Sequence, residues 1–217
     1  MILGIVVGLE AEAALARKLG GSVHVATSGA TADGASRAAA ELVRLGVTHL
    51  LSFGLAAGLD PVLQPGTLLV PERVVAGDDT FECDAAFRTL IGAGHAAPLL
   101  HSDVLVSTVA EKAVLFRATG CGSLDMESGA VARAARTHRL SFAVLRAICD
   151  NAERALPPAA RVPLRADGRL HAAAIAASIL GRPGQLPMLL ALGRDVARAK
   201  TALAGRVDAL AKSFTSV

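Results

Sequence analysis

The sequence predicts one α/β domain in which helices cover both faces of an open sheet. Short apolar runs alternate along the chain with longer helix-like segments, which is the pattern of such a sheet. Hydrophobic residues make up 53% of the 217 residues, and this excludes a disordered chain. A chain of this length fits a single domain that buries roughly 70% of its unfolded surface.

The first half of the chain alternates strands with helices. Apolar runs predict four strands, at residues 3–8, 23–27, 49–53 and 67–75. Helices are expected over residues 10–19 and 33–45, with Asp33 near the N-cap of the second. The third strand runs into a glycine-rich segment, residues 54–58.

The second half begins with residues 76–98, which carry several acids and glycines and are expected to be irregular. The elements expected after them are a strand over 99–107, a helix after Thr108, a helix over 128–139 and a strand over 142–148. The proline-rich residues 156–163 are the one candidate linker, and they lead to two C-terminal helical segments.

Composition excludes several classes of protein. The chain has no Trp or Tyr and only six Phe, which argues against a nucleic-acid binder that stacks bases on aromatic rings. Cys83, Cys121 and Cys149 are scattered and odd in number, so they indicate reduced cytosolic thiols rather than disulfides or a zinc site. No histidine pair has metal-ligand spacing, and no apolar run reaches the ~18 residues of a membrane span.

Charge is distributed unevenly along the chain. Residues 1–153 contain 12 Lys and Arg against 16 Asp and Glu, whereas residues 154–217 contain 10 against 3. The acidic body is typical of a cytosolic enzyme, and the basic tail requires a separate explanation.

Two segments carry the candidate chemistry. Asp125 and Glu127 flank a methionine at the start of a helix, and Arg146 and Asp150 lie at the end of a strand. Helix starts favour acids, and ligands of α/β sheets bind where strands end, so these groups can face one site. The alternative is that Asp150 caps a turn and Glu127 is an ordinary N-terminal helix acid.

These segments, with the opening GIVVGLEAEA and Gly54–Val74, resemble the purine nucleoside phosphorylase and methylthioadenosine nucleosidase superfamily. The resemblance covers about residues 3–153 and implies a three-layer fold with a central mixed, twisted sheet, in one catalytic domain over 1–217. Members cleave the bond between a base and C1′ of ribose and need no cofactor or metal.

The resemblance also implies a role for each matching residue. Asp150 would be the acid that protonates N7 of adenine, and Glu12 the base that activates water. Met126 and Glu127 would hold the ribose, with Arg146 orienting Glu127. Without the resemblance, Glu12 would be interpreted as a solvated acid in the first turn of a helix, as Glu10 is.

Further contacts are implied around these residues. Gly54 and Leu55 would belong to a glycine-rich turn beneath the nucleophile, and Leu105 and Val106 would contact the purine edge through the main chain. Asp125 stands where nucleosidases commonly carry glutamate, so its sugar contact would be one methylene shorter.

The nucleophile is expected to be water. Phosphorylases of this superfamily hold phosphate with N-terminal arginines and with Ser or Thr in the glycine-rich turn, where this chain has Leu55. Burying a dianion with few donors is costly. Inorganic phosphate as co-substrate stays the alternative, because Ser28, Thr31 or Arg37 could bind it.

The tail narrows the resemblance. Residues 155–170 and 179–203 look like the tail of the hopanoid-associated phosphorylases, which remove adenine from adenosylhopane on the way to ribosylhopane. This implies a lipid-linked nucleoside as substrate. The alternatives are a methylthioadenosine/S-adenosylhomocysteine nucleosidase, and a non-catalytic nucleoside- or lipid-binding protein with the same fold.

The last 32 residues, 186–217, contain an amphipathic helix. Its apolar positions recur every three or four residues, at Leu189, Leu192, Val196, Ala199, Leu203, Val207, Leu210 and Phe214. A basic amphipathic helix suits peripheral contact with the inner membrane, whereas the alternative is packing on the sheet or on a second subunit. Relatives are dimers or larger, so a cytoplasmic homo-oligomer is expected.

Overall fold

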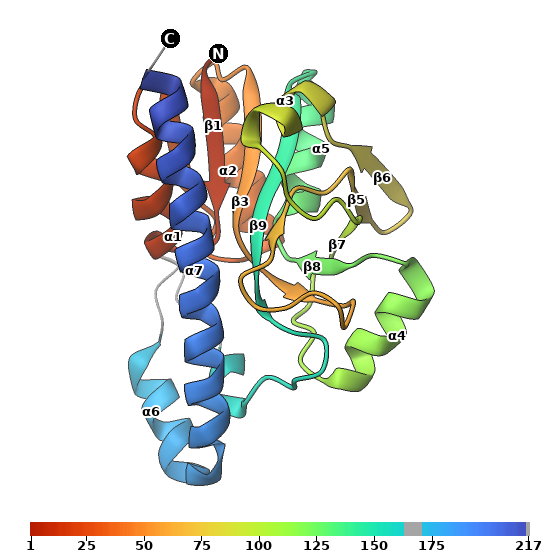
Figure 1. Ribbon diagram of the computed structural model, residues 1–217, viewed down its shortest axis with the longest axis vertical. Coiled ribbons are helices and arrows are strands. Elements are labelled where there is room, and N and C mark those ends of the chain that lie inside the picture. The colour runs from red at the N-terminus through yellow and green to blue at the C-terminus, as the bar shows by residue number, and fades with distance from the viewer. Residues whose placement is uncertain (163–170, 216–217) are drawn as a thin grey trace.

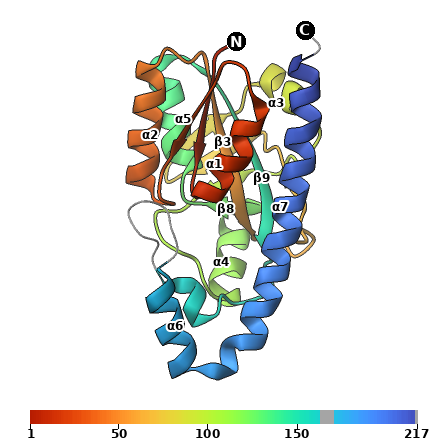
Figure 2. The ribbon, with the colours of Figure 1, turned by 90° about the vertical axis from the view of Figure 1, so that its left-hand side faces the viewer.

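The computed structural model describes residues 1–162 and 171–215, with side chains to residue 212. A mixed sheet forms the middle layer, and helices cover both of its faces (Figures 1 and 2). The strands are β1 (Leu3–Val7), β2 (Val23–Thr27), β3 (His49–Gly58), β4 (Leu68–Leu69), β5 (Arg73–Ala76), β6 (Asp79–Glu82), β7 (Leu99–His101), β8 (Ser123–Asp125) and β9 (Ser141–Asp150). The helices are α1 (Glu10–Ala16), α2 (Ala32–Arg44), α3 (Ala85–Ile91), α4 (Val109–Thr119), α5 (Ser128–His138), α6 (Ala172–Gly181) and α7 (Leu186–Thr215). The predicted fold class is therefore confirmed.

Strands β3 and β9 are parallel neighbours at the centre of the sheet, although 82 residues separate their nearest ends. β1 and β2 continue the sheet in parallel beside β3, while β8 is antiparallel to it. β4 is antiparallel to β9, and β6 is antiparallel to β5. These antiparallel pairs make the sheet mixed, as the resemblance implies.

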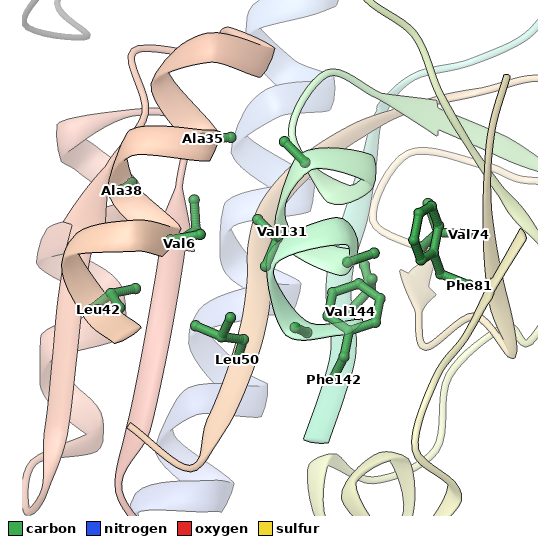
Figure 3. Close-up of a cluster of buried hydrophobic side chains, with 14 of the residues drawn as sticks. Val6, Ala35, Ala38, Leu42, Leu50, Val74, Phe81, Val131, Phe142 and Val144 are labelled. Atoms are coloured by element: carbon green, nitrogen blue, oxygen red, sulfur yellow. The ribbon is translucent and has the colours of Figure 1, made fainter. Parts of the chain in front are cut away.

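The two faces of the sheet bury different side chains of the same strand. In β9, Phe142 and Val144 pack under α2 and α5, in the cluster shown in Figure 3. Ala143, Leu145 and Ala147 pack on the opposite face with α1, α3 and α7. Because side chains alternate along a strand, Arg146 continues the row that faces α5.

Helix α7 is only partly a core helix. Ala199, Leu203, Val207 and Leu210 are buried against the face formed by β1, β3 and β9, which confirms packing on the sheet for this half. The side chain of Phe214 lies outside the described residues. The first part of α7 extends with α6 beyond the end of the sheet (Figures 1 and 2).

Several boundaries differ from the sequence-based expectations. Residues 54–58 are not a turn but the second half of β3. Residues 54–57 pair with β9 through a one-residue bulge, and Gly58 pairs with β8. Residues 67–75 form two strands, because Pro71 lies between β4 and β5 and cannot donate to a ladder. Of the expected strand over 99–107, only β7 is extended.

One local expectation was wrong because short-range capping decided the outcome. Residues 76–98 contain β6 and α3, whose N-terminus is capped by Asp84 accepting from the Phe87 N–H at 2.8 Å. Thr31 is the N-cap of α2 and accepts from the Gly34 N–H, and Asp33 lies near it in the first turn, as expected. The helix expected after Thr108 is α4, and Thr108 caps it in a capping box with Glu111.

No single helix among residues 1–162 and 171–215 is long and apolar enough to cross a membrane. Only α6 taken together with Pro183–Lys212 has enough length and hydropathy, and that pair is bent by 108°.

Candidate active site

Arg146 is the centre of a buried network of charges. Its side chain is 2% exposed, and it contacts Asp125 through Nε at 2.7 Å and Glu127 through Nη2 at 2.8 Å. It also donates to the Leu55 carbonyl at 2.9 Å and to the Ser52 hydroxyl at 2.8 Å. The predicted contact between Arg146 and Glu127 is therefore present. We call Arg146, Asp125, Glu127 and Glu12 the Arg146 cluster.

The alternation of β3 and β9 explains why this cluster forms. Ser52 on β3 and Arg146 on β9 point to the same face of the sheet as the apolar side chains buried under α5. Both therefore reach the start of that helix. The Ser128 hydroxyl there donates to Ser52 at 2.8 Å. A polar group buried at this depth needs a partner, and both hydroxyls and the two Nη groups of Arg146 have one.

Asp125 joins Arg146 to the start of α5. Its Oδ1 accepts the Ser128 N–H at 3.0 Å and the Glu127 N–H at 3.3 Å, and its Oδ2 accepts the Ser128 hydroxyl. Burial acts to raise the pKa of Asp125, but Arg146 and these hydrogen bonds lower it below the ordinary value. Both oxygens of Asp125 are therefore engaged by other groups of the protein.

Glu12 is buried and not solvated. Its Oε2 accepts the N–H groups of Gly8 at 3.0 Å and Leu9 at 2.8 Å, and its Oε1 accepts that of Leu55 at 2.9 Å. Only 4% of the residue is exposed, whereas Glu10 is exposed and pairs with Arg17 at 2.9 Å. α1 thus presents one acid to solvent and one to the end of β3.

Two glycines make room for the carboxylates. A Cβ at Gly54 would lie 2.5 Å from Glu12 Oε1, and its φ of +147° is one that other residues rarely adopt. A Cβ at Gly8 would lie 2.8 Å from Glu127 Oε1 and 3.4 Å from Glu12 Oε2. The backbone of Gly8 therefore lies against both acids, so Glu12 and Glu127 face one region.

The cluster holds three acids around one cation. Burial raises the pKa of Glu127 to about 7, and the nearby Asp125 and Glu12 add to this while Arg146 opposes it. Burial also raises the pKa of Glu12, against the effect of Arg146 and of the backbone donors. Carboxyl groups that titrate near neutrality are suited to proton transfer.

Asp150 is buried at the end of β9 and pairs with an unexpected partner. Lys112 of α4 donates to Asp150 Oδ2 at 2.6 Å, and its side chain is fully buried. Asp150 Oδ1 is buried without a hydrogen-bond partner among the described residues. Burial raises the pKa of Asp150, while Lys112 lowers it.

Sequence reasoning missed Lys112. In α4 the valines Val109 and Val114 are 42% and 55% exposed, while the lysine between them is 0% exposed. The sequence contains no signal for this inverted arrangement, because it depends on which face of α4 packs against the rest of the protein.

The remaining predicted contact residues differ in how far they are exposed. Met126 is half-buried between Asp125 and Glu127. In the loop after β7, Val106 is 6% exposed and Leu105 is 47% exposed. His101 lies beside Asp125, with Nδ1 4.0 Å from Oδ1, and against Gly129, where a Cβ would lie 2.5 Å from the ring.

Other candidate groups are not organised for catalysis. Burial raises the pKa of the Cys149 thiol to about 12, which keeps it neutral. Among the described residues, no group of three His, Cys, Asp or Glu could hold a metal ion. A groove of about 470 Å³ lies between β6, the end of α5 and the start of β9, and shares no residue with the Arg146 cluster.

Comparison with known proteins agrees with this architecture. A family model described as Phosphorylase superfamily matches residues 95–180, which include Asp125, Glu127, Arg146 and Asp150. A comparison with curated protein sequences gave no match.

Solved structures resemble the whole fold. The methylthioadenosine/S-adenosylhomocysteine nucleosidase of Colwellia psychrerythraea, in complex with adenine, has 19% identity and a TM-score of 0.66, covering 82% of this chain and 94% of its own. The S-adenosylhomocysteine nucleosidase of Streptococcus pyogenes has 16% identity and a TM-score of 0.67, covering 96% of each chain. The futalosine hydrolase of Helicobacter pylori has 18% identity and a TM-score of 0.66, covering 82% of this chain and 97% of its own.

At these identities the structural matches establish the fold. The family match adds that residues 95–180 are similar to the Phosphorylase superfamily.

Proposed function

We propose that this protein is a nucleosidase that uses water to release adenine from a 5′-modified adenosine. The observation that carries the proposal is the Arg146 cluster, in which Glu12 and Glu127 face one region. Asp150 lies four residues after Arg146 on the same strand, β9. One acid for the leaving base, one carboxylate for the sugar and one for the nucleophile satisfy the needs of N-glycosidic cleavage.

The charge of the cluster favours water over phosphate. Glu12, Asp125 and Glu127 surround the single cation Arg146, whose guanidinium is already engaged by two carboxylates. A phosphate dianion would meet repulsion from these acids and few donors. Leu55 offers no side-chain donor, and Arg37 is exposed on α2.

The proposed reaction proceeds through a ribosyl cation. As the C1′–N9 bond breaks, its electron pair enters the purine and Asp150 gives a proton to N7. A water oxygen bonds to C1′ and Glu12 accepts its proton, while Glu127, held by Arg146, binds the ribose hydroxyls. The products are adenine and the free sugar, and both acids return to their starting states by exchange with solvent.

The proposed 5′ substituent is the hopane skeleton of adenosylhopane. This choice rests on the tail resemblance and on the apolar surface near α6, described below. The second candidate substrate is methylthioadenosine, which is favoured by the similarity of the fold to methylthioadenosine/S-adenosylhomocysteine nucleosidases. A small substituent needs no apolar surface outside the site.

One assay tests both points. Purified protein is incubated with adenosylhopane or methylthioadenosine, with and without inorganic phosphate, and adenine and the sugar product are measured. We expect adenine release without phosphate and faster turnover of adenosylhopane. A ribose 1-phosphate product would identify a phosphorylase, whereas substrate binding without adenine release would identify a binding protein.

The projecting corner of α6 and α7 forms a surface suited to an anionic membrane. Leu180 is 83% exposed and Leu190 is 63% exposed, with Leu186 at 43% and Met188 at 38%. We define these four side chains as the apolar corner. Exposed arginines flank it, at positions 182, 194 and 198. Apolar insertion flanked by cations is the physics of interfacial binding.

Membrane contact is therefore proposed for the apolar corner and not for the buried half of α7. Replacing Leu186 and Leu190 with Ser should abolish salt-sensitive co-sedimentation with anionic vesicles while adenine release from methylthioadenosine is unchanged. Val62→Ser, at a 68% exposed position, serves as control. The corner is instead a subunit contact if the parent protein does not bind the vesicles and the double variant differs from the parent in oligomeric state. Cytoplasmic location and a homo-oligomer remain part of this proposal.

A further inference from the structure

The buried lysine of α4 is fully engaged at the end of β9. Lys112 Nζ lies 2.6 Å from Asp150 Oδ2, 2.7 Å from the Asn151 carbonyl and 2.8 Å from the Arg154 carbonyl. An ammonium has three donors, and these three contacts use all of them. Lys112 therefore fixes the position of Asp150 Oδ2 and of the backbone that follows Asp150.

The other oxygen of Asp150 is left available. Oδ1 is buried and has no hydrogen-bond partner within the part of the chain that the structure describes. A buried acceptor without a partner is costly, so it requires an explanation, and a catalytic role is one. The bulge at Cys149 contributes to this placement, since it shifts the register so that Asp150 pairs with Ala57.

α4 also joins the acid to the segment expected at the purine edge. Ser107, just before α4, accepts the Leu156 N–H at 2.8 Å, while Lys112 binds the carbonyls of residues 151 and 154. A single helix thereby sets the position of the loop after β7 relative to Asp150.

We propose, on the basis of the proposed function, that Lys112 is a positioning residue that directs Asp150 Oδ1 toward N7 of the base and stabilises the carboxylate formed after proton transfer. The proton on Oδ1 passes to N7 as the C1′–N9 bond breaks. The negative charge that remains on Asp150 is then 2.6 Å from the ammonium. Lys112 keeps all of its protons throughout the step.

Other charged groups near Asp150 are already paired or neutral. Arg154, in the loop after β9, forms an ion pair with Asp195 of α7, which also binds Arg198 at 3.3 Å. The neighbouring Cys149 has a pKa of about 12 and carries no charge near neutrality. Lys112 is therefore the cation in direct contact with the acid.

The test is the pH profile of kcat/KM for adenine release from methylthioadenosine. Asp150 must be protonated to act, so activity falls as the pH rises through its pKa in the free enzyme. Removing an adjacent cation raises a carboxyl pKa, by about 1–3 units for a close pair. Lys112→Met should therefore move the alkaline limb to higher pH, and Lys112→Arg should restore its position.

The control is Lys18→Met at an exposed position on the first helical segment, which should leave the limb unchanged. A Lys112→Met enzyme with lower activity but an unmoved limb would show that the lysine has a structural role only, and would overturn the inference.

A measurement on the parent protein covers the case in which Lys112→Met does not fold. The ¹⁵N resonance of the Lys112 ammonium should show a titration step that is lost in Asp150→Asn. Absence of the step in the parent would also overturn the inference. This experiment needs no turnover, so it separates failure of the lysine role from failure of the proposed function, which would appear as a parent enzyme that releases no adenine.

Discussion

Arg146 holds together residues that lie far apart in the sequence. It contacts Asp125 and Glu127 from the start of α5 and the Leu55 carbonyl from β3, while Leu55 donates to Glu12 from α1. Loss of a buried charge partner costs far more than loss of an exposed one. Each acid makes a different set of contacts, so substitution of one acid at a time can assign a separate role to each.

Asp150→Asn should abolish adenine release without unfolding the protein. An amide cannot protonate N7, and loss of a general acid costs ~10²–10⁴-fold in rate. The matched control is Asp78→Asn at an exposed position. Turnover of the Asp150 variant comparable with that of the parent would exclude this residue as the acid, and circular dichroism would confirm that the fold persists.

Glu12→Gln should slow hydrolysis strongly while an adenosine analogue still binds. Its carboxylate is assigned to water and not to the base, and a glutamine has no basic oxygen of that strength. The control is Glu10→Gln, two residues earlier on the exposed side of α1, and this variant should behave as the parent does. Calorimetry with the analogue separates binding from turnover, and a parallel loss of both would assign Glu12 to substrate binding.

Glu127→Gln should make stability less sensitive to pH. Burial raises the pKa of Glu127 from 4.5 to about 7, so the folded protein binds a proton that the unfolded chain has released. This group's contribution to stability is therefore full below about pH 4.5 and is lost as the pH rises toward 7. Denaturant unfolding across that range should show a slope reduced by one proton in the variant, relative to an exposed Glu41→Gln control. An unchanged slope would contradict the raised pKa.

Among the elements, α7 combines two environments in one helix. Leu203 is 0% exposed against the sheet, whereas Leu190 is 63% exposed beyond its end. The regular spacing of apolar residues predicts one continuous face, and the structure shows that only part of that face meets the core. Spacing reports which residues share a face but not how far the neighbouring layer extends.

Leu203→Ala should destabilise the protein by about 2–5 kcal/mol, which is the usual cost of such a core truncation. Leu190→Ala, the same change in the same helix, should be nearly neutral because the side chain leaves no cavity. Denaturation midpoints of the two variants decide between the environments. Equal destabilisation would mean that another surface covers Leu190 in solution.

The sequence predicted most strands and helices of this molecule, because apolar runs and capping residues act locally. It also predicted Glu12, Glu127, Arg146 and Asp150 as a group. Glu127 forms an ion pair with Arg146 and Glu12 interacts with it electrostatically, whereas Asp150 pairs with Lys112. The continuation of β3 through residues 54–58 was missed, since its partner β9 lies far along the chain. Lys112 was missed for the same reason, because only tertiary packing turns it inward.

For the whole molecule, the position of α7 has a consequence for synthesis on the ribosome. Strands β1, β3 and β9 expose one apolar face that Ala199, Leu203, Val207 and Leu210 later cover. Because the chain emerges from its N-terminus, the other face can acquire α2 and α5 while this one still lacks α7. The nascent protein therefore passes through a stage with an uncovered hydrophobic sheet, the kind of surface that aggregates or recruits chaperones, and completion of the fold awaits a late segment of the chain.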